Sequence, residues 1–351
     1  MAQILNKRQE AILGLLERNN SLAISEILQS LSLDFKNVSR VTINRDLKDL
    51  LVSGYLKSYG QGRSTVYKLS DYYNLIRPID IEKYFKVETD KRDIKEKFNF
   101  EIFSLLKNIF IERESVELNS LNAVYQKNIK IISDNLRKRE FERLIIELSW
   151  KSSQIEGNTY SLLETEALIK RKEQVSGHKK EEAIMILNHK EALDYISKNR
   201  ADYKKISVSK IEDIHYLLTK NLGITRNLRK TGVGITGTRY RPLDNNQQIK
   251  EALEKACVIV NKEKNPFSKA VILSILIAYI QPFEDGNKRT SRLTANAILL
   301  ANGICPLSYR NVNETDYKKA VVLFYEQNNI TFFKQLFIEQ FEFAVENYFK
   351  I

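Results

Sequence analysis

A run of eleven largely apolar residues, AVILSILIAYI at 270–280, constrains the fold more than any other stretch of this chain. Because the run is apolar on all sides, we expect a buried helix that ends near Ile280. QPFEDGNKRTSR follows directly at 281–292, and LTANAILLANG then resumes a helical pattern. Pro282 and Gly286 are expected to force a loop, with the next helix starting around Asn287. The chain therefore carries a charged loop between two buried helices.

The composition narrows the class of protein. Only 12 Gly and 5 Pro in 351 residues predict a mostly α-helical chain of two or three domains. The net charge of +12 favours polyanionic partners such as nucleic acid or nucleotides. The apolar run is too short to span a bilayer, and the two cysteines show no metal spacing. We expect a cytoplasmic protein with reduced thiols and no membrane partner.

Residues 1–70 are expected to form a winged helix-turn-helix domain. Helical spacing covers 4–19, 23–31 and 39–54, and two alternating, strand-like runs then flank the turn GQG at 60–62. Three helices followed by a hairpin describe a winged helix. The stretch T-x-x-R-D-L at 42–47 resembles the third helix of the DeoR-like winged helices of transcriptional regulators.

The charge of this segment favours a DNA-binding role. Residues 36–68 carry seven cations against two carboxylates, a net charge of +5. We expect the third helix to face a major groove and the wing tip to reach a phosphate, through Arg40, Thr42, Asn44, Arg45, Lys48 and Arg63. The alternative is a winged helix used for protein contacts or dimerisation, with its charges on a solvated face.

The rest of the chain falls into two parts. Residues 71–138 are charged and helical without an assignable motif, so we expect a helical linker subdomain. Helix signals dominate residues 139–351 and are interrupted by RKTGVGITGTRYRPLDNN at 229–246. Its GVGITG matches the dinucleotide fingerprint G-x-G-x-x-G, but that motif must follow a strand and open a helix. The β-branched residues predict a β-hairpin instead.

The charged loop combines the features of a phosphate-binding site. The free N–H groups at the start of the next helix, with Gly286 allowing close approach, make an anion cradle. Arg289 and Arg292 are three residues apart and can point along one helix face towards it. Asp285 lies beside the cradle and could hold a Mg²⁺ ion that bridges phosphate oxygens. The alternative is a helix N-terminus with an acidic cap and surface arginines.

Residues 281–292 resemble the Fic motif, H-P-F-x-[DE]-G-N-[GK]-R-x-x-R, and match it at every defined position except the first. SSQIEGN at 152–158 is similar to the inhibitory motif of the family, [ST]-x-x-x-E-[GN], placed N-terminal to the core as in one Fic subclass. The segment 229–242 looks like the Fic flap, with Arg229 at the usual arginine. The resemblance covers most of 139–351 and implies a Fic-type helical bundle with a β-hairpin flap.

The resemblance implies transfer of AMP from ATP to a protein hydroxyl. Asp285 would coordinate Mg²⁺, and Arg292 would bind the γ-phosphate unless Glu156 occupies that arginine first. The implied nucleotide-binding residues are Phe283, Gly286, Asn287, Lys288, Arg289 and Arg292, with Arg289 at the β-phosphate. The implied inhibitory residues are Ser152, Glu156 and Gly157, and those of the target flap are Val233, Ile235 and Gly237.

Gln281 stands where the family has its catalytic histidine, and Arg289 holds the other catalytic position. Histidine takes the proton from the attacking hydroxyl, whereas a glutamine amide cannot accept it. Loss of a general base typically costs about 10²–10⁴-fold in rate. None of the three histidines, His178, His189 and His215, clearly substitutes. We therefore expect a Fic-family protein adenylyltransferase that is inhibited by Glu156 and impaired by Gln281, with an unknown target protein or itself as substrate.

The alternative function is that of a non-catalytic, nucleotide-binding transcriptional regulator. Its Fic domain would sense nucleotide or pair with itself as a homodimer. The glutamine at 281 favours this alternative, whereas the intact cradle favours an enzyme.

Overall fold

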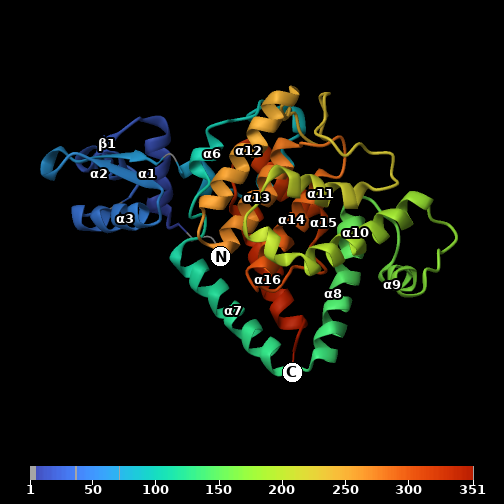
Figure 1. Cartoon of the computed structure of the whole chain (residues 1–351). Coiled ribbons are helices and arrows are strands. Elements are labelled where there is room, and N and C mark those ends of the chain that lie inside the picture. Colours follow the sequence, from blue (N-terminus) through green and yellow to red (C-terminus); the bar gives the residue numbers. More distant parts are fainter. Residues whose placement is uncertain (1–4, 36–37, 71, 351) are drawn as a thin grey trace. The chain divides into compact units, whose positions relative to one another are not determined.

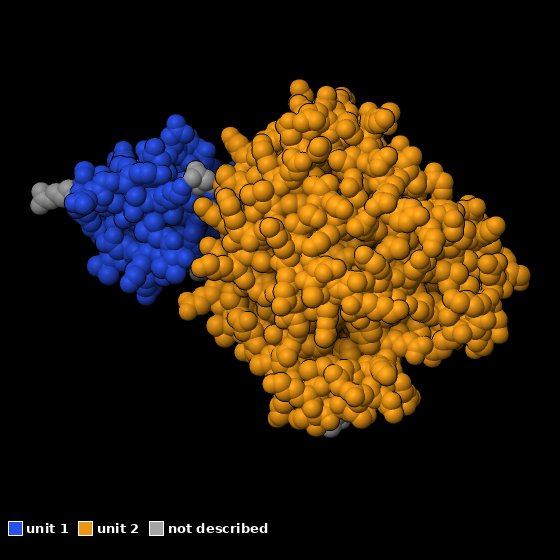
Figure 2. Space-filling model, in the orientation of Figure 1, with its two compact units in different colours: residues 1–84, 327–331 blue, residues 85–326, 332–351 orange. Residues whose placement is uncertain are grey.

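The computed structural model describes residues 5–35, 38–70 and 72–350, apart from the side chain of Arg63. The chain divides into two compact units (Figure 2). Unit 1 comprises Met1–Tyr84 and Gln327–Thr331, and unit 2 comprises Phe85–Glu326 and Phe332–Ile351. The domain boundaries drawn from the sequence, at 70 and 138, stay predictions.

Unit 1 is built from three helices and a small antiparallel sheet. Its elements in chain order are α1 (Lys7–Arg18), β1 (Leu22–Ala23), α2 (Ile24–Leu31), α3 (Arg40–Val52), β2 (Leu56–Tyr59) and β3 (Val66–Leu69). The strand order is β1-β3-β2, with β2 and β3 joined as a hairpin. The three helices and the hairpin expected from the sequence are present, and β1 is an additional strand.

The core of unit 1 follows from the apolar stripes of its helices. Ile12, Ile27, Ile43, Leu47 and Leu50 are all buried and pack into one cluster. Ser39 caps α3, since its Oγ accepts from the Thr42 N–H at 3.2 Å. Asp46 on α3 is also buried, where its carboxylate accepts from Arg8 Nε on α1 at 2.6 Å.

A short segment late in the chain completes unit 1. Ile330 N donates to the carbonyl of Leu75 at 2.8 Å, within α4 (Tyr73–Ile76). Asn329 Nδ2 donates to the carbonyls of Asn74 and Arg77 at 3.0 and 2.8 Å. Sequence reasoning missed this association because residues so far apart in the chain give no local signal.

Unit 2 is a helical bundle. Its helices are α6 (Ile102–Leu105), α7 (Glu112–Ile131), α8 (Asp134–Ile155), α9 (Leu162–Arg171), α10 (Lys180–Lys198), α11 (Val208–Thr219), α12 (Asn246–Lys262), α13 (Pro266–Ile280), α14 (Asn287–Ala301), α15 (Glu314–Gln327) and α16 (Thr331–Asn347). A short α5 (Ile81–Lys86) precedes them. Figure 1 shows α13 and α14 in the middle of the bundle, with α10, α11, α12 and α15 around them. No helix in the described part of the chain is long and apolar enough to cross a membrane.

Helices α13 and α14 confirm the central prediction from the sequence. Residues 270–280 are all buried, and α13 ends at Ile280 as expected. Asn265 caps α13 by accepting from two N–H groups, and Pro266 occupies its first turn, where no N–H is needed. The next helix, α14, begins at Asn287 and is buried almost throughout. A hydrogen bond of 2.9 Å between the Ser274 and Ser291 hydroxyls joins the two helices.

The predicted β-hairpin at 229–242 is wrong. Within 229–242 the described backbone forms no strand, and its one ladder contact is an isolated parallel bridge between Arg241 and Lys97. Arginine side chains take carbonyls that a ladder would use: Arg229 Nη1 donates to Thr231 O at 2.7 Å, and Arg92 Nη2 to Gly237 O at 2.7 Å. Glycines at 232, 234 and 237 further weaken strand formation. We keep the name flap for residues 229–242.

Candidate active site

The loop between α13 and α14 has an unusual backbone held by side chains. Gln281 closes α13 in the left-handed region, with φ 51° and ψ 60°. Gly286 has φ 77°, and a Cβ there would lie 3.1 Å from Thr219 Cγ2, so any other residue would be strained and crowded at this position. Asn287 Oδ1 accepts from Phe283 N at 2.9 Å, and its Nδ2 donates to Phe283 O at 2.8 Å. These bonds fix the loop before any ligand binds.

The start of α14 presents free backbone donors. Its first intrahelical bond runs from Thr290 N to Gly286 O at 2.9 Å. The N–H groups of Asn287, Lys288 and Arg289 therefore have no acceptor within the helix. Because the helix dipole also places partial positive charge here, the position attracts an anion.

Two buried arginines lie in the first and second turns of α14. Arg289 is 2% exposed and donates through Nη2 to Asp285 Oδ2 at 3.1 Å. Arg292 is fully buried. Within the described part of the chain, Nε and Nη1 of Arg289 and Nη1 of Arg292 have no hydrogen-bond partner. Such donors are rare in a folded protein unless a ligand completes them.

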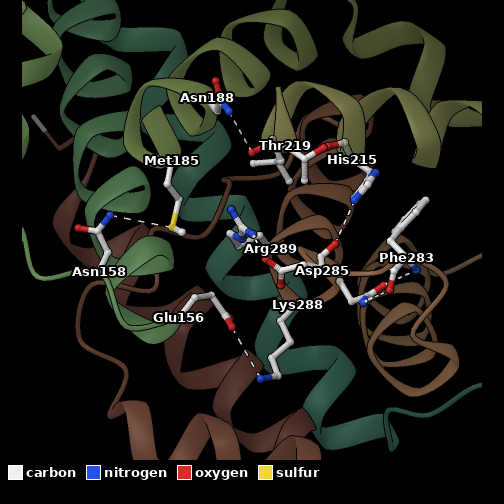
Figure 3. A network of polar contacts seen from close by, with 12 residues as sticks. Glu156, Asn158, Met185, Asn188, His215, Thr219, Phe283, Asp285, Lys288 and Arg289 are labelled. Carbon is white, nitrogen blue, oxygen red and sulfur yellow. Dashed lines mark hydrogen bonds and ion pairs between the residues drawn. The ribbon is translucent and has the colours of Figure 1, made fainter. Parts of the chain in front are cut away.

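Glu156 occupies part of this positive site. It follows the last residue of α8, and its Oε1 accepts from Arg292 Nη2 at 2.8 Å. Figure 3 shows it facing Lys288, whose Nζ lies 3.7 Å from Oε2. Burial opposes ionisation of Glu156, but the charges of Arg292 and Lys288 outweigh it and lower the pKa of the carboxyl. Gly157 then turns the chain with φ 94°, a conformation that favours glycine.

A buried relay holds Arg292 from behind. Ser152 Oγ accepts from Arg292 Nε at 2.9 Å and lies 2.8 Å from His189 Nε2. His189 Nδ1 lies 3.0 Å from Met185 O and must donate to it, so Nε2 accepts the Ser152 proton. Burial, with the charges of Arg289 and Arg292, lowers the pKa of His189 to about 3. Sequence reasoning missed this role, although His189 shares a helical stripe with Ile186 and Leu193.

Gln281 is held by three hydrogen bonds. Its Nε2 donates to Ala278 O at 2.6 Å and to Tyr325 Oη at 3.2 Å. Its Oε1 accepts from Asn287 Nδ2 at 3.1 Å. The amide therefore has a fixed orientation and no group that can take a proton.

The other two histidines do not replace a base at position 281. His215 Nε2 donates to Asp285 O at 3.0 Å, and its ring stacks on Phe283 with centroids 3.7 Å apart. Burial lowers its pKa to about 4. His178 lies 2.8 Å from Thr159 Oγ1, through Nδ1. Phe283 is fully buried in this stack.

A cavity of about 470 Å³ opens in front of the cradle. The cradle, the flap, the end of α8 and one face of α15 line it, with side chains that include Glu156, Val233, Ile235, Gln281, Asp285, Lys288, Val321 and Tyr325. Gly157, Gly286 and Asn287 also line it, whereas Ser152, Gly237, Phe283, Arg289 and Arg292 do not. The structure thus brings the predicted residues together, with the arginines and Ser152 behind the cavity wall.

A magnesium ion fits this site only if phosphate oxygens of a bound nucleotide complete its coordination. Within the described residues no three His, Cys, Asp or Glu side chains gather as a metal site. The Asp285 side chain is 68% exposed beside the cradle. Mg²⁺ is commonly bound by one or two carboxylates together with substrate phosphates and water, so a single carboxylate suffices.

Five of the six predicted DNA-binding residues of unit 1 lie on α3. Arg40, Asn44, Arg45 and Lys48 are exposed. Thr42 is half-buried, and its hydroxyl lies 2.9 Å from Ser39 Oγ at the cap. The side chain of Arg63 lies outside the described structure.

Comparisons with known proteins agree with the geometry of unit 2. Residues 205–299 match the sequence model of the Fic/DOC family. The protein adenylyltransferase Fic of Nematostella vectensis is 31% identical over 193 residues, which cover 51% of this chain and 43% of that protein. The protein adenylyltransferase fic-1 of Caenorhabditis elegans is 26% identical over 159 residues, covering 44% of this chain and 31% of that protein. The chain thus spans less than half the length of these curated relatives.

Solved structures show the same fold. Fic-1 (residues 134–508) from C. elegans matches with a TM-score of 0.57 at 19% identity, covering 67% of this chain and 71% of that one. A Fic domain containing signaling protein from Bacteroides thetaiotaomicron matches with a TM-score of 0.56 at 18% identity, covering 66% and 94%. The region that holds α13, the loop and α14 is therefore similar to the Fic/DOC family, and the surrounding fold is that of Fic proteins.

Proposed function

We propose that unit 2 is a protein adenylyltransferase, which transfers AMP from ATP to a hydroxyl group of a protein. The unpartnered donors of Arg289 and Arg292 carry this proposal, because they lie behind a helix N-terminus at a cavity of nucleotide size. A polyphosphate in the cavity would be stabilised by the charge of these guanidinium groups behind the wall and by the free N–H groups at the start of α14. The names of the curated relatives support the same activity.

Each wall of the cavity suits one part of ATP. The N–H groups of Asn287 and Lys288 would hold phosphate oxygens, with the charge of Arg289 behind them. Asp285 would hold Mg²⁺, which neutralises phosphate charge and helps the leaving group depart. Val321, Val322 and Tyr325 form an apolar wall on α15, which suits the base.

The transfer needs a proton acceptor. The oxygen of the target hydroxyl bonds to the α-phosphorus, and the bond from that phosphorus to the oxygen bridging the β-phosphate breaks. Pyrophosphate leaves, and the hydroxyl proton must pass to a base. Gln281 cannot take it and is fixed by its three hydrogen bonds. We therefore expect transfer by this chain to be slow.

Glu156 would inhibit the domain from within. Its carboxylate accepts from the guanidinium that would otherwise bind the terminal phosphate. ATP bound beside it meets a like charge, which displaces the triphosphate and misaligns the α-phosphate for attack.

A titration of Mg·ATP tests the nucleotide site. Arg289→Met keeps the length of the side chain but removes its charge and its donors, so the affinity for Mg·ATP should fall at least about 10-fold. Arg143→Met is the control, since Arg143 pairs with Glu140 at 2.6 Å, away from the cavity. Absence of Mg·ATP binding, or equal affinity in wild type and Arg289→Met, contradicts the proposal.

For unit 1 we propose a winged-helix module that binds duplex DNA. The support is the order of three helices and a β2–β3 wing, together with the exposed Arg40, Asn44, Arg45 and Lys48 on α3. A module for protein contacts is the alternative. The homodimer and the cytoplasmic location expected from the sequence stay predictions.

A purely regulatory, non-catalytic role for the whole chain has one observation in its favour. The fixed amide of Gln281 leaves the position of the family histidine without a base. The adenylyltransferase names of the curated relatives do not favour that role. Transfer by a Glu156→Gly/Gln281→His variant, which restores a base and removes the inhibitory carboxylate, separates a weakened enzyme from a nucleotide sensor.

A further inference from the structure

Residues 92–97, which we call the strap, bind the second half of the flap. Arg241 N donates to Glu96 O at 2.7 Å, and Lys97 and Arg241 form a parallel bridge. Arg239 reaches back with two bonds, from Nη2 to Arg92 O at 2.6 Å and from Nη1 to Glu96 Oε1 at 2.7 Å. The strap therefore fixes flap residues 237–241 through both backbone and side chains.

Arg92 links the flap to the cavity wall. Its Nη2 donates to Gly237 O at 2.7 Å and lies 3.3 Å from Glu326 Oε1 near the end of α15. Arg92 is 5% exposed and Glu326 is fully buried. Lys95 N also donates to Glu326 O at 2.9 Å. A buried ion pair gives little net stability compared with apolar packing, so its presence favours a role in fixing geometry.

Two arginines hold the flap on either side of its cavity-facing residues. Arg229 Nη1 donates to Thr231 O, and Arg92 Nη2 donates to Gly237 O, each at 2.7 Å. Between them, residues 233–236 line the cavity. Within the described structure residues 232–236 make no hydrogen bond of their own. Their backbone groups are free to pair with an extended chain.

We propose that Arg92 is a positioning residue, which holds flap residues 232–236 at the distance from the cradle that target docking requires. This inference rests on the proposed transfer function. Arg92 does not line the cavity, so we expect its side chain to act on the flap through Gly237 O, while Glu326 and Thr89 Oγ1 hold the guanidinium in place. Losing it should loosen the flap and slow transfer without weakening Mg·ATP binding.

Hydrogen exchange of the full chain tests the hold on the flap directly. In Arg92→Lys, which keeps a positive charge for Glu326 but replaces the guanidinium that donates to Gly237 O, the Tyr240 and Arg241 amides should exchange about 10-fold faster. These two flap amides are protected in wild type, where they donate to Thr238 Oγ1 and Glu96 O. Amides 287–292 should be unchanged. Arg92→Met should show the same pattern more strongly. Lys334→Met is the matched control, since it breaks another buried pair, with Glu114 at 2.8 Å, and should lower thermal stability without a selective effect on the flap.

Kinetics in a Glu156→Gly/Gln281→His background test the positioning role. With self-modification as the readout, Arg92→Lys should lower kcat at least about 10-fold while the KM for ATP stays within about twofold. Unchanged flap exchange in both Arg92 variants overturns the proposal, as does faster exchange with normal kcat. Absence of Mg·ATP binding in every variant refutes the transfer function instead, and the exchange result still decides whether Arg92 holds the flap.

Discussion

Replacing Glu156 with glutamine removes one charge from the site and keeps the shape of the side chain. In the wild-type protein the Glu156 carboxylate accepts from Arg292 Nη2 at 2.8 Å, a charged hydrogen bond worth about 1.5–3 kcal/mol. The contact with Lys288 at 3.7 Å adds at most about 1 kcal/mol, because both side chains are partly exposed. If ATP must break the Arg292 bond to bind, Glu156→Gln should raise Mg·ATP affinity roughly 10- to 100-fold.

The same change should destabilise the protein without ATP. Arg292 is fully buried, and loss of its carboxylate partner leaves an unpaired charge at a cost of about 3 kcal/mol or more. The melting temperature of free Glu156→Gln should therefore fall below that of wild type. Saturating ATP should restore most of the loss, since a tighter ligand gives a larger shift. Loss of the Glu156–Arg292 bond should thus raise the affinity for Mg·ATP and lower the melting temperature of the free protein.

Isothermal titration with Mg·ATP and thermal melting with and without nucleotide measure both effects. Glu314→Gln is the control, because Glu314 pairs with Lys151 at 3.4 Å and does not line the cavity. It should leave ATP affinity within about twofold of wild type. Equal ATP affinity in wild type and Glu156→Gln would refute the reasoning, as would weaker binding in the variant.

Three further predictions concern other parts of the molecule. Charge reversal of Arg45 and Lys48 should weaken binding of the full chain to duplex DNA and flatten its salt dependence, which a filter-binding series at several salt concentrations measures; no salt-dependent binding by wild type would contradict a DNA-binding role. Ile235→Pro should abolish target modification but leave the calorimetric Mg·ATP affinity nearly unchanged, because it blocks strand pairing at the flap; an equal loss of ATP binding would make the flap structural. His189 stays neutral in the folded protein down to about pH 3 but titrates near 6.5 when unfolded, so stability should fall as pH drops below 6.5, by about 2 kcal/mol at pH 5. Denaturant unfolding of wild type and His189→Gln above pH 6.5 and at pH 5 checks this, since the variant should lack the loss of stability that His189 causes between these pH values.

Local signals predicted the centre of the fold well. The apolar run at 270–280 has no polar face, which predicts a buried helix. Gly286 predicts the loop that separates this helix from the next one. In the same way Ser39 marked the start of α3. These features depend on residues close in sequence, where propensity and capping decide the structure.

Long-range features were beyond the same reasoning. The flap has β-branched residues, but arginines at 92 and 229 take two of its carbonyls, and it forms no hairpin. His189 reaches Ser152 only because α8 and α10 pack together. The ring of Phe283, in the loop before α14, likewise stacks on His215 of α11. Contacts of this kind depend on which elements meet, and single-sequence patterns do not encode that.

The double variant Glu156→Gly/Gln281→His gives the most direct test of the central claim, that unit 2 is an adenylyltransferase silenced at two steps. Each variant is incubated with Mg²⁺ and ATP labelled at the α-phosphate, and label on the protein is followed over time. Glu156→Gly alone lacks a base and Gln281→His alone keeps the inhibitory carboxylate, so both should label slowly. The double variant should label itself faster than the product of the two single effects, as expected when two residues serve one chemical event. Vigorous labelling by wild type, or a double variant that binds Mg·ATP yet labels neither itself nor any added protein, would contradict the account.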